Sequence, residues 1–225
     1  VTRRQRQMCI RDRPTCIRTT HTFNKHEPNF WHEVNTMVQT PELRVNEHVV
    51  LQPATNGVLV AMFDAYQEDP EAAQSALPWL NPDDDVRRQL RDMLYDIEAQ
   101  NGSDQLHFWS IHRTDTMEFV GLVGLGDELQ SLHADFNLGY WVRRAHRRKN
   151  MASACVDTIF GWLTNRESST TVEIAVHPHN EAGLATADAI CARWGGERLP
   201  EFIGIEFNER TVPHHLHLVD LGPEA

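Results

Sequence analysis

The clearest periodic pattern of apolar positions lies between residues 152 and 163. Apolar residues recur there at intervals of three and four, and mostly polar or small residues fill the positions between them. The apolar set is Ala152, Cys155, Val156, Ile159, Phe160 and Leu163. Such spacing forms one stripe along an α-helix. The segment therefore predicts a helix that begins near residue 152 and packs this stripe on the core.

Similar patterns predict the rest of an α/β (α+β) domain. Three more helices are expected: one spanning 59–66, one starting at the Asn-Pro-Asp-Asp-Asp run of 81–85, and one spanning 184–194. Short apolar runs predict strands at 45–52, 106–112, 118–125, 136–142, 170–176, 198–207 and 214–219. Pro53 should stop the first strand, and 113–116 should form the turn after the second. This order predicts a mixed sheet with helices on its faces.

The first 41 residues lack this periodicity, and we expect one folded domain over 42–225. Residues 1–18 hold six of the 21 Lys and Arg residues and a single acidic residue. The stretch RRQRQMCIRDR at 3–13 resembles the peptide encoded by translated sequencing-adapter DNA. This favours a non-native basic tail over a targeting arm or a nucleic-acid tail. For residues 19–41 we expect a short helix or a partly disordered extension.

Charge and composition narrow the class of protein. Beyond residue 18 there are 15 Lys and Arg against 31 Asp and Glu, a net charge of −16, which argues against binding to nucleic acid or an acidic membrane. No apolar run is long enough to span a bilayer. The cysteines, Cys9, Cys16, Cys155 and Cys191, match no zinc or redox spacing. We therefore expect a cytoplasmic protein with reduced thiols, as a monomer or homodimer.

One dense basic cluster interrupts this acidic chain. Residues 143–149 read RRAHRRK, between the predicted strand at 136–142 and the predicted helix. The backbone amides of such a turn and the positive end of the following helix can face one anion. Asn150 is the residue best suited to a positive φ in this turn. The pattern indicates a site for a phosphate-bearing ligand; a nucleic-acid patch and a solvated loop are the alternatives.

The residues VRRAHRRKNMA at 142–152 resemble the acetyl-CoA signature of the GNAT acetyltransferase superfamily, which ends a strand and opens a helix with Arg/Gln-x-x-Gly-x-Gly/Ala. Arg147 matches the first position, Asn150 replaces the first Gly, and Ala152 matches the last. The segments LRV at 43–45, LPWL at 77–80, FVGLVGL at 119–125, LGYWV at 138–142 and VEIAVHPHN at 172–180 resemble the RimJ/RimL-like branch. The resemblance covers about residues 42–212.

Two features depart from the family pattern. The family usually has Asn-x-x-Ser after its fifth strand, whereas Asn180 is followed by Gly183 in that position. The Gly-Phe that usually closes the next helix is replaced by Gly195-Gly196, four residues later. Because four residues are roughly one helical turn, the apolar face of the helix can survive this insertion. The missing Ser hydroxyl removes the usual proton donor.

The resemblance implies a GNAT-like fold: a mixed, mostly antiparallel sheet of six to seven strands, with helices on both faces and a splay between strands four and five. Acetyl-CoA would lie in that splay as a co-substrate, without a metal. The cofactor-binding set that it implies is Tyr140, Trp141, Val142, Arg147, Arg148, Lys149, Asn150, Met151, Ala152 and Asn180. A backbone amide of the strand would polarise the thioester.

Direct transfer of the acetyl group to a primary amine would then need a proton acceptor and a proton donor. The resemblance implies Glu206 as the base, with Glu201 and Glu173 as substitutes, Tyr140 as the donor to the thiolate, and Asn180 at the reacting centre. Eleven carboxylates between Asp64 and Asp104 predict a cationic amine or a basic peptide N-terminus as acceptor; a solvated acidic face is the alternative.

Two further interpretations stay open. The His pairs of 177–179 and 214–217 tempt toward a metal, but solvated strand ends are favoured because zinc needs three or four convergent ligands. With Gly183 in place of Ser, the domain could also be a catalytically weak acyl-CoA-binding sensor or partner module.

Overall fold

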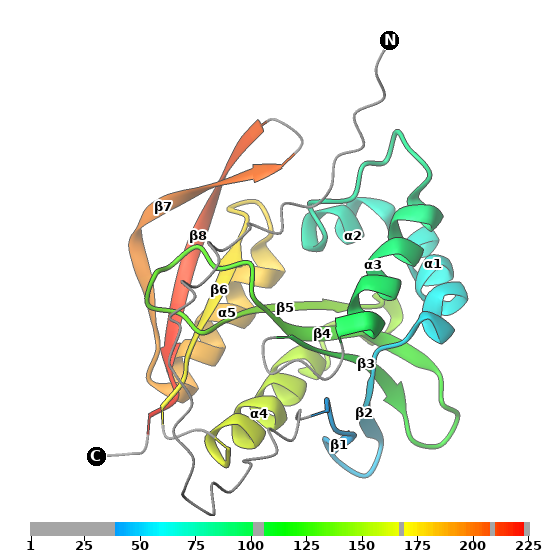
Figure 1. Ribbon diagram of the computed structural model, residues 1–225, viewed down its shortest axis with the longest axis horizontal. Helices are drawn as coiled ribbons and strands as arrows, with labels where there is room; N and C mark the ends of the chain where they lie inside the picture. Colours follow the sequence, from blue (N-terminus) through cyan, green and yellow to red (C-terminus); the bar gives the residue numbers. More distant parts are fainter. Residues whose placement is uncertain (1–38, 101–105, 167–168, 208–209, 223–225) are drawn as a thin grey trace, which may run out of the picture. The chain divides into compact units, whose positions relative to one another are not determined.

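An eight-stranded mixed sheet forms the framework of the computed structural model, which describes residues 39–100, 106–166, 169–207 and 210–222. The strand order is β1-β2-β3-β4-β5-β6-β8-β7, and only β5 and β6 are parallel (Figure 1). The strands are β1 (Leu43–Arg44), β2 (Val49–Pro53), β3 (His107–Arg113), β4 (Phe119–Gly126), β5 (Phe136–Val142), β6 (Thr171–Val176), β7 (Glu197–Phe207) and β8 (Arg210–Asp220). The mixed, mostly antiparallel sheet is confirmed, with more strands than predicted. The predicted tail at 1–18 and nearly all of the extension at 19–41 lie outside the described residues.

The first predicted strand, 45–52, is wrong at its start. Residues 45–48 turn back between β1 and β2, and the amide of His48 donates to the side chain of Asn46 at 2.8 Å. Asn captures nearby backbone amides in this way and competes with strand pairing. Pro53 is the last residue of β2, as its missing amide requires.

Three helices precede β3, where the sequence predicted two. They are α1 (Leu59–Glu68), which follows a short 3-10 turn at Asn56–Val58, α2 (Pro70–Ala76) and α3 (Val86–Gln100). The missed helix, α2, starts with Pro at its first position and is capped by Asp69, whose carboxylate accepts from the amide of Ala72. Residues 81–85, predicted as the first turn of a helix, lie before α3. The cap there is Asp85, which accepts from the amide of Arg88 at 2.9 Å.

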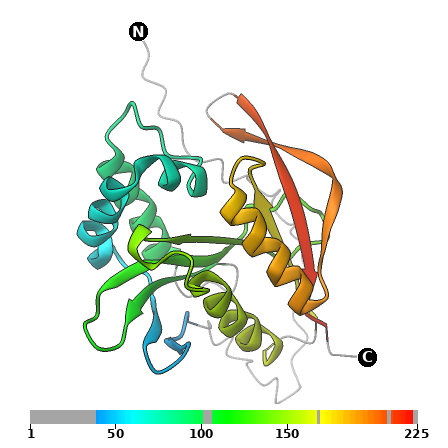
Figure 2. The same cartoon turned by 180° about the vertical axis from the view of Figure 1, so that it is seen from behind.

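The remaining helices, α4 (Met151–Thr164) and α5 (Glu181–Trp194), follow the predicted ranges; a 3-10 turn at Arg144–His146 leads into α4. Gly195 ends α5 at a φ of 71°, a conformation that glycine adopts without strain. In Figure 2, α4 and α5 lie side by side, and the rings of Phe160 and Trp194 meet edge to face between them.

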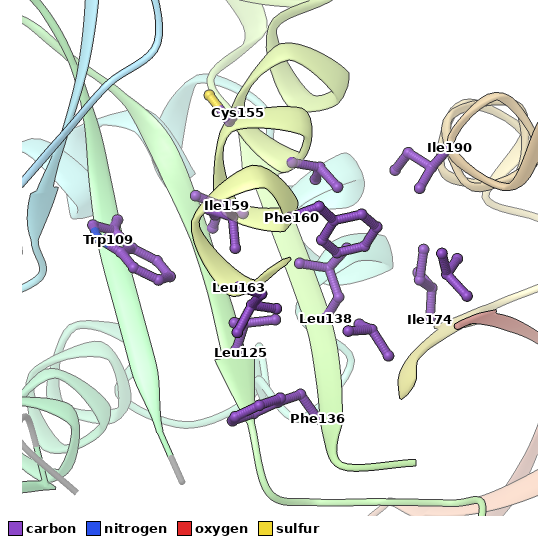
Figure 3. Close-up of a cluster of buried hydrophobic side chains, with 14 of the residues drawn as sticks. Trp109, Leu125, Phe136, Leu138, Cys155, Ile159, Phe160, Leu163, Ile174 and Ile190 are labelled. Carbon is purple, nitrogen blue, oxygen red and sulfur yellow. The ribbon is translucent and has the colours of Figure 1, made fainter. Parts of the chain in front are cut away.

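The helices cover the two faces of the sheet and enclose two cores. One core places α1, α2 and α3 over β4 and β5, where Leu122 and Trp141 are buried. The other places α4 and α5 over β3 to β6 and β8. Figure 3 shows the apolar stripe of α4 between the strands and α5. The predicted helix stripe is confirmed, because Cys155, Val156, Ile159, Phe160 and Leu163 are all fully buried.

Candidate functional site

A gap opens in the middle of the sheet, between β5 and β6. Within these described strands, β5 pairs with β6 only at Phe136 and Asn137, opposite Val172 and Glu173. On its other edge β5 pairs with β4 from Asn137 to Val142. The predicted splay between the fourth and fifth predicted strands is therefore confirmed, and the later half of β5 has a free edge.

Backbone amides of Tyr140 and Val142 point into this gap. The amide of Arg143 donates to Val120 on β4 at 2.8 Å. Hydrogen-bonding groups of successive residues in a strand alternate between its two edges. The amides of Val142 and Tyr140 must therefore face away from β4, where they can donate to a ligand oxygen.

The turn that leads into α4 has an unusual backbone. Arg148 and Asn150 both have positive φ, 59° and 54°, and Lys149 lies between them. The prediction of positive φ at Asn150 is confirmed; Arg148 was not foreseen. Non-glycine residues rarely adopt this conformation, which turns successive amides toward one concave point that suits an anion. The amino end of the 14-residue helix α4 adds its positive dipole to the same turn.

The basic residues of this turn divide into two groups. Arg147 is turned inward: its Nε donates to the carbonyl of Val142 at 2.7 Å, and its Nη1 to Asp69 at 2.6 Å. Its Nη2 is buried and has no hydrogen-bond partner among the described residues. Arg148 and Lys149 are exposed, and the ammonium of Lys149 donates to the carbonyl of Ala145 at 2.9 Å. The exposed side chains of Arg148 and Lys149 are therefore accessible to a bound phosphate.

Two carboxylates hold arginines of this basic segment in place: Glu68 of α1 holds Arg143, and Asp69, between α1 and α2, holds Arg147. Glu68 accepts from Arg143 Nε at 2.9 Å, and this hydrogen bond lowers the pKa of Glu68. Burial raises the pKa of Asp69, but hydrogen bonds from Arg147 and the amide of Ala72 outweigh it and leave that pKa lowered. The turn is thus tied to the helices on the opposite core.

A small cavity lies at the open end of the gap. It offers about 70 Å³, room for an acetyl group or a few water molecules rather than for a whole cofactor. Residues of β5, β6, α5 and β8 line it, together with Ser75, Ala76 and Pro78. Its polar side chains are Ser75, Tyr140, His177, Asn180 and His214. Of the eleven carboxylates between Asp64 and Asp104, the ten that lie in the described residues do not line it.

Tyr140 and Asn180 meet at the start of α5. The hydroxyl of Tyr140 donates to the carbonyl of Gly183 at 3.1 Å, and burial raises the pKa of this phenol. Asn180 caps the helix by accepting from the amide of Gly183 at 2.9 Å. A Cβ at Gly183 would lie 2.6 Å from Nδ2 of Asn180. A larger residue at position 183 would therefore require Asn180 to shift from this position.

Two histidines complete the cavity, and sequence reasoning assigned them to solvated strand ends. His177 follows β6 and His214 lies on β8; their ring centroids are 5.6 Å apart. His214 is buried and shares its strand face with the buried Leu216. That alternation was the available sequence signal, because a polar residue in register with apolar ones indicates a protected side chain.

The other predicted site residues lie at varied distances from this cavity. Trp141 is buried in the α1–α3 core, so it can meet a ligand only through its backbone. Met151 and Ala152 are half-buried at the start of α4. Glu206 is exposed near the end of β7 and accepts a hydrogen bond from Thr211, outside the residues that line the cavity.

The two substitute bases also lie apart from the cavity lining. Glu173 is fully buried at the closed end of the gap, where its carboxylate accepts from the amides of Gln130 and Ser131, both at 2.7 Å, and from the amide side chain of Asn137. It fixes the loop before β5. Glu201 is exposed on β7.

The described residues contain neither a candidate metal cluster nor a helix that could span a membrane. No group of three or more His, Cys, Asp or Glu side chains in them could hold a metal ion. None of their helices combines the length and the apolar character that crossing a bilayer requires.

Comparisons with known proteins agree with this geometry. Residues 48–190 match the acetyltransferase (GNAT) domain family. No curated protein sequence matches the chain. Among solved structures, an acetyltransferase from Salmonella typhimurium that modifies the N-terminal serine of the 50S ribosomal subunit protein L7/L12 is similar over 80% of this chain and 98% of its own, with 12% identity and a TM-score of 0.64.

Two more structures have the same fold. The ribosomal-protein-S5-alanine acetyltransferase from Vibrio fischeri matches 79% of this chain and 95% of its own, with 12% identity and a TM-score of 0.61. The microcin C7 self-immunity acetyltransferase MccE, in complex with acetyl-CoA and AMP, matches 82% and 97%, with 10% identity and a TM-score of 0.64. At these identities the likeness establishes the fold.

Proposed function

Because this chain belongs to the acetyltransferase (GNAT) family, whose domain matches 48–190, we propose that it transfers the acetyl group of acetyl-CoA directly to a primary amine. The family makes it an acetyl-CoA-dependent acetyltransferase. Beyond the family, we propose the class of amine that accepts the acetyl group and the roles of single residues.

The observation that carries the proposal is the convergence of three features on one gap. The free edge of β5, the amide-rich turn before α4 and the small polar cavity all border the space between β5 and β6. A thioester cofactor with a phosphate-bearing end fits this arrangement. Its phosphates would meet the turn, and its acyl end would meet the cavity.

The turn would hold the phosphates chiefly through its backbone. Amides of residues 148–152 and the positive end of α4 favour an anion, and the exposed side chains of Arg148 and Lys149 add formal charge. Arg147 supports this turn from beneath, because its guanidinium bridges Val142 and Asp69.

The free edge of β5 would align the acyl end. Acetyl-CoA supplies an activated acetyl thioester. Amides of Tyr140 and Val142 can hydrogen-bond to it, and one of them can stabilise the negative charge that develops on the thioester oxygen. Trp141 lies between these two amides, and its side chain anchors the strand in the α1–α3 core.

Tyr140 is the proposed donor to the departing thiolate. Tyr140 lines the cavity, and its hydroxyl keeps its proton at neutral pH because burial raises the pKa of the phenol. Asn180 shapes the same wall: its side-chain oxygen caps α5, and its Nδ2 is left to meet the ligand. We keep both residues as site residues on this geometry.

The proposed acceptor is a cationic primary amine, either a peptide α-amine or a small amine such as a polyamine. The two ribosomal-protein acetyltransferases of similar fold act on a serine and an alanine, which makes peptides that begin with Ser or Ala the first acceptors to test. In the part of the chain that the structure describes, no carboxylate lines the cavity. Preference for cations would therefore come from the net charge of −16 beyond residue 18, acting at long range. We also propose a cytoplasmic location, in which the buried thiols of Cys155 and Cys191 stay reduced.

Release of the CoA thiol tests this function. The full chain is incubated with acetyl-CoA and, in turn, with a peptide beginning with Ser, a peptide beginning with Ala, and spermidine, and acetylated products are identified by mass. We expect thiol release with at least one amine. The Arg148→Glu/Lys149→Glu variant should lose acetyl-CoA affinity. Arg91→Glu, a charge reversal at an exposed residue of α3, should keep it. Binding of acetyl-CoA without transfer to any amine would favour the acyl-CoA-binding module.

A further inference from the structure

The protonation pattern of the two cavity histidines assigns a role that neither the family nor the sequence motifs supply. His177 and His214 come from different elements, and their rings meet edge to face with centroids 5.6 Å apart. Both line the cavity at the open end of the gap, together with Tyr140.

The hydrogen bonds of His214 fix its tautomer. Its Nδ1 lies 3.0 Å from the carbonyl of Val212. A carbonyl can only accept, so Nδ1 carries the hydrogen, and in the neutral ring Nε2 has a lone pair. Among the described residues, Nε2 has no hydrogen-bond partner. His214 therefore offers a free proton acceptor.

The neighbouring ring has the opposite tautomer. Nδ1 of His177 accepts from the amide of His179 at 3.1 Å. Its lone pair is thus engaged, and in the neutral ring the hydrogen lies on Nε2. In the neutral rings, Nε2 of His177 is therefore a donor and Nε2 of His214 an acceptor. The acceptor of such a pair can hydrogen-bond the ammonium form of an amine, and the donor can hydrogen-bond the neutral amine that remains after the proton has moved.

The surroundings keep His214 neutral at neutral pH. Burial lowers the pKa of His214, and nearby His177 lowers it further, whereas the hydrogen bond to Val212 works in the opposite direction. Burial and His179 likewise lower the pKa of His177. Among the described residues, the titratable groups that line the cavity are these two rings and Tyr140, without any Asp, Glu, Lys or Arg. The ring of Phe207 covers His214 from β7.

Resting on the proposed acetyl transfer, we propose that Nε2 of His214 is the general base that removes the proton from the acceptor ammonium. It takes the place that the resemblance gives to Glu206. Glu206 lies three residues along β7 from Ile203, the partner of His214 in the sheet, which is about 10 Å of strand. Its carboxylate also accepts from Thr211.

The transfer balances with these groups. The ammonium gives one proton to Nε2 of His214, and the freed nitrogen lone pair forms a bond to the carbonyl carbon of the acetyl group. The C–S bond breaks, and its electron pair goes to sulfur. The nitrogen loses a second proton to water as the amide forms, and the thiolate gains one from Tyr140, which is reprotonated by solvent. His214 then releases its proton to water.

The pH dependence of kcat/KM distinguishes this base from simple attack by free amine. With His214 as base, the reactive pair is neutral imidazole and ammonium. The wild-type profile should rise through the lowered pKa of His214, stay level, and fall only above the pKa of the α-amine, about 8. His214→Gln should react only through free amine, so its kcat/KM should be about 100-fold lower at neutral pH and rise steadily to about pH 8.

Two further measurements separate a lost base from a damaged fold. A weakly basic acceptor, such as a hydrazide, is already neutral and needs no base, so the deficit of His214→Gln should largely disappear with it. Added imidazole should restore part of the activity of His214→Ala. His215→Gln, a neighbour that packs on Phe202 instead, serves as the matched control and should keep the wild-type profile.

The outcomes are distinct. A wild-type plateau that His214→Gln loses, with normal acetyl-CoA binding by calorimetry, supports the assignment. Equal profiles for wild type and His214→Gln, or an equal deficit with the weakly basic acceptor, overturn it and leave the proposed acetyl transfer intact. Absence of transfer by the wild type to every amine tested overturns both.

Discussion

The two ends of the gap between β5 and β6 differ in how their polar groups are used. At the closed end, Phe136 and Asn137 pair with β6, and buried Glu173 accepts three hydrogen bonds. At the open end, the amides of Tyr140 and Val142 face no strand, and Nε2 of His214 has no partner among the described residues. The closed end is complete without a ligand, whereas the open end offers donors and an acceptor that only a ligand would engage. Stability and chemistry are thus separated along one pair of strands.

Breaking the closed end should have the largest effect. In Glu173→Ala, three donors at the closed end lose their buried acceptor. We expect the free energy of unfolding to fall by about 3 kcal/mol or more, measured by urea denaturation. Exposed Glu201→Ala is the control and should change this energy by less than about 0.5 kcal/mol. Equal stability of the two variants would contradict the structural role of Glu173.

The same contrast divides neighbouring arginines of the turn. Arg147→Glu would place a carboxylate beside Asp69 and the carbonyl of Val142, so we expect a loss of about 2 kcal/mol in unfolding free energy. Arg148→Glu, exposed beside it, should keep the melting temperature and weaken acetyl-CoA binding about tenfold. Thermal denaturation and calorimetric titration measure the two effects. If Arg148→Glu lowered the melting temperature and Arg147→Glu only weakened acetyl-CoA binding, then Arg147 rather than Arg148 would face the cofactor.

Features set by nearby residues could be predicted from the sequence, whereas a short helix and a tight turn could not. The α4 stripe, the positive φ of Asn150 and strands β3 to β6 depend on neighbours within a few residues, so their pattern was readable. The short helix α2 was missed because its seven residues hold too few apolar positions to show a period. The turn at 45–48 was missed because Val45 is a typical strand residue, while the turn itself depends on the Asn46 side chain and on the carbonyl of Val49, which accepts from the amide of Val45.

The local geometry of the candidate site could be predicted from the sequence, whereas its long-range contacts could not. The signature at 142–152 identified the turn, but the fate of Arg147 depends on Asp69, 78 positions earlier. His177 and His214 meet only because β8 pairs with β6. Spacing along a chain does not encode such a meeting, and the sequence therefore favoured a glutamate on β7 as the base.

A smaller effect is expected at Tyr140. Tyr140→Phe removes the proposed proton donor while keeping the ring that packs in the gap. We expect kcat to fall about tenfold, with acetyl-CoA affinity and melting temperature nearly unchanged. Steady-state kinetics beside calorimetry separates the two. A rise in KM at constant kcat would indicate that Tyr140 only binds substrate.

The smallest effect concerns charge at long range. Since no carboxylate of the described residues lines the cavity, the acidic chain should favour a basic peptide over a neutral one only a fewfold. Added salt should remove this preference as the screening length falls to about 8 Å or less. The measurement is kcat/KM for both peptides at low and high salt. A large preference that survives high salt would instead require a carboxylate in contact with the acceptor.

Amide hydrogen exchange, followed residue by residue with and without acetyl-CoA, tests the central claim most directly, namely that the open end of the gap receives the cofactor. The account predicts that acetyl-CoA slows exchange at Tyr140, Val142 and residues 148–152. Exchange at Phe136 and Asn137, which pair with β6 at the closed end, should be the same with and without acetyl-CoA. Binding of acetyl-CoA that leaves the amides of Tyr140 and Val142 unprotected would contradict the account.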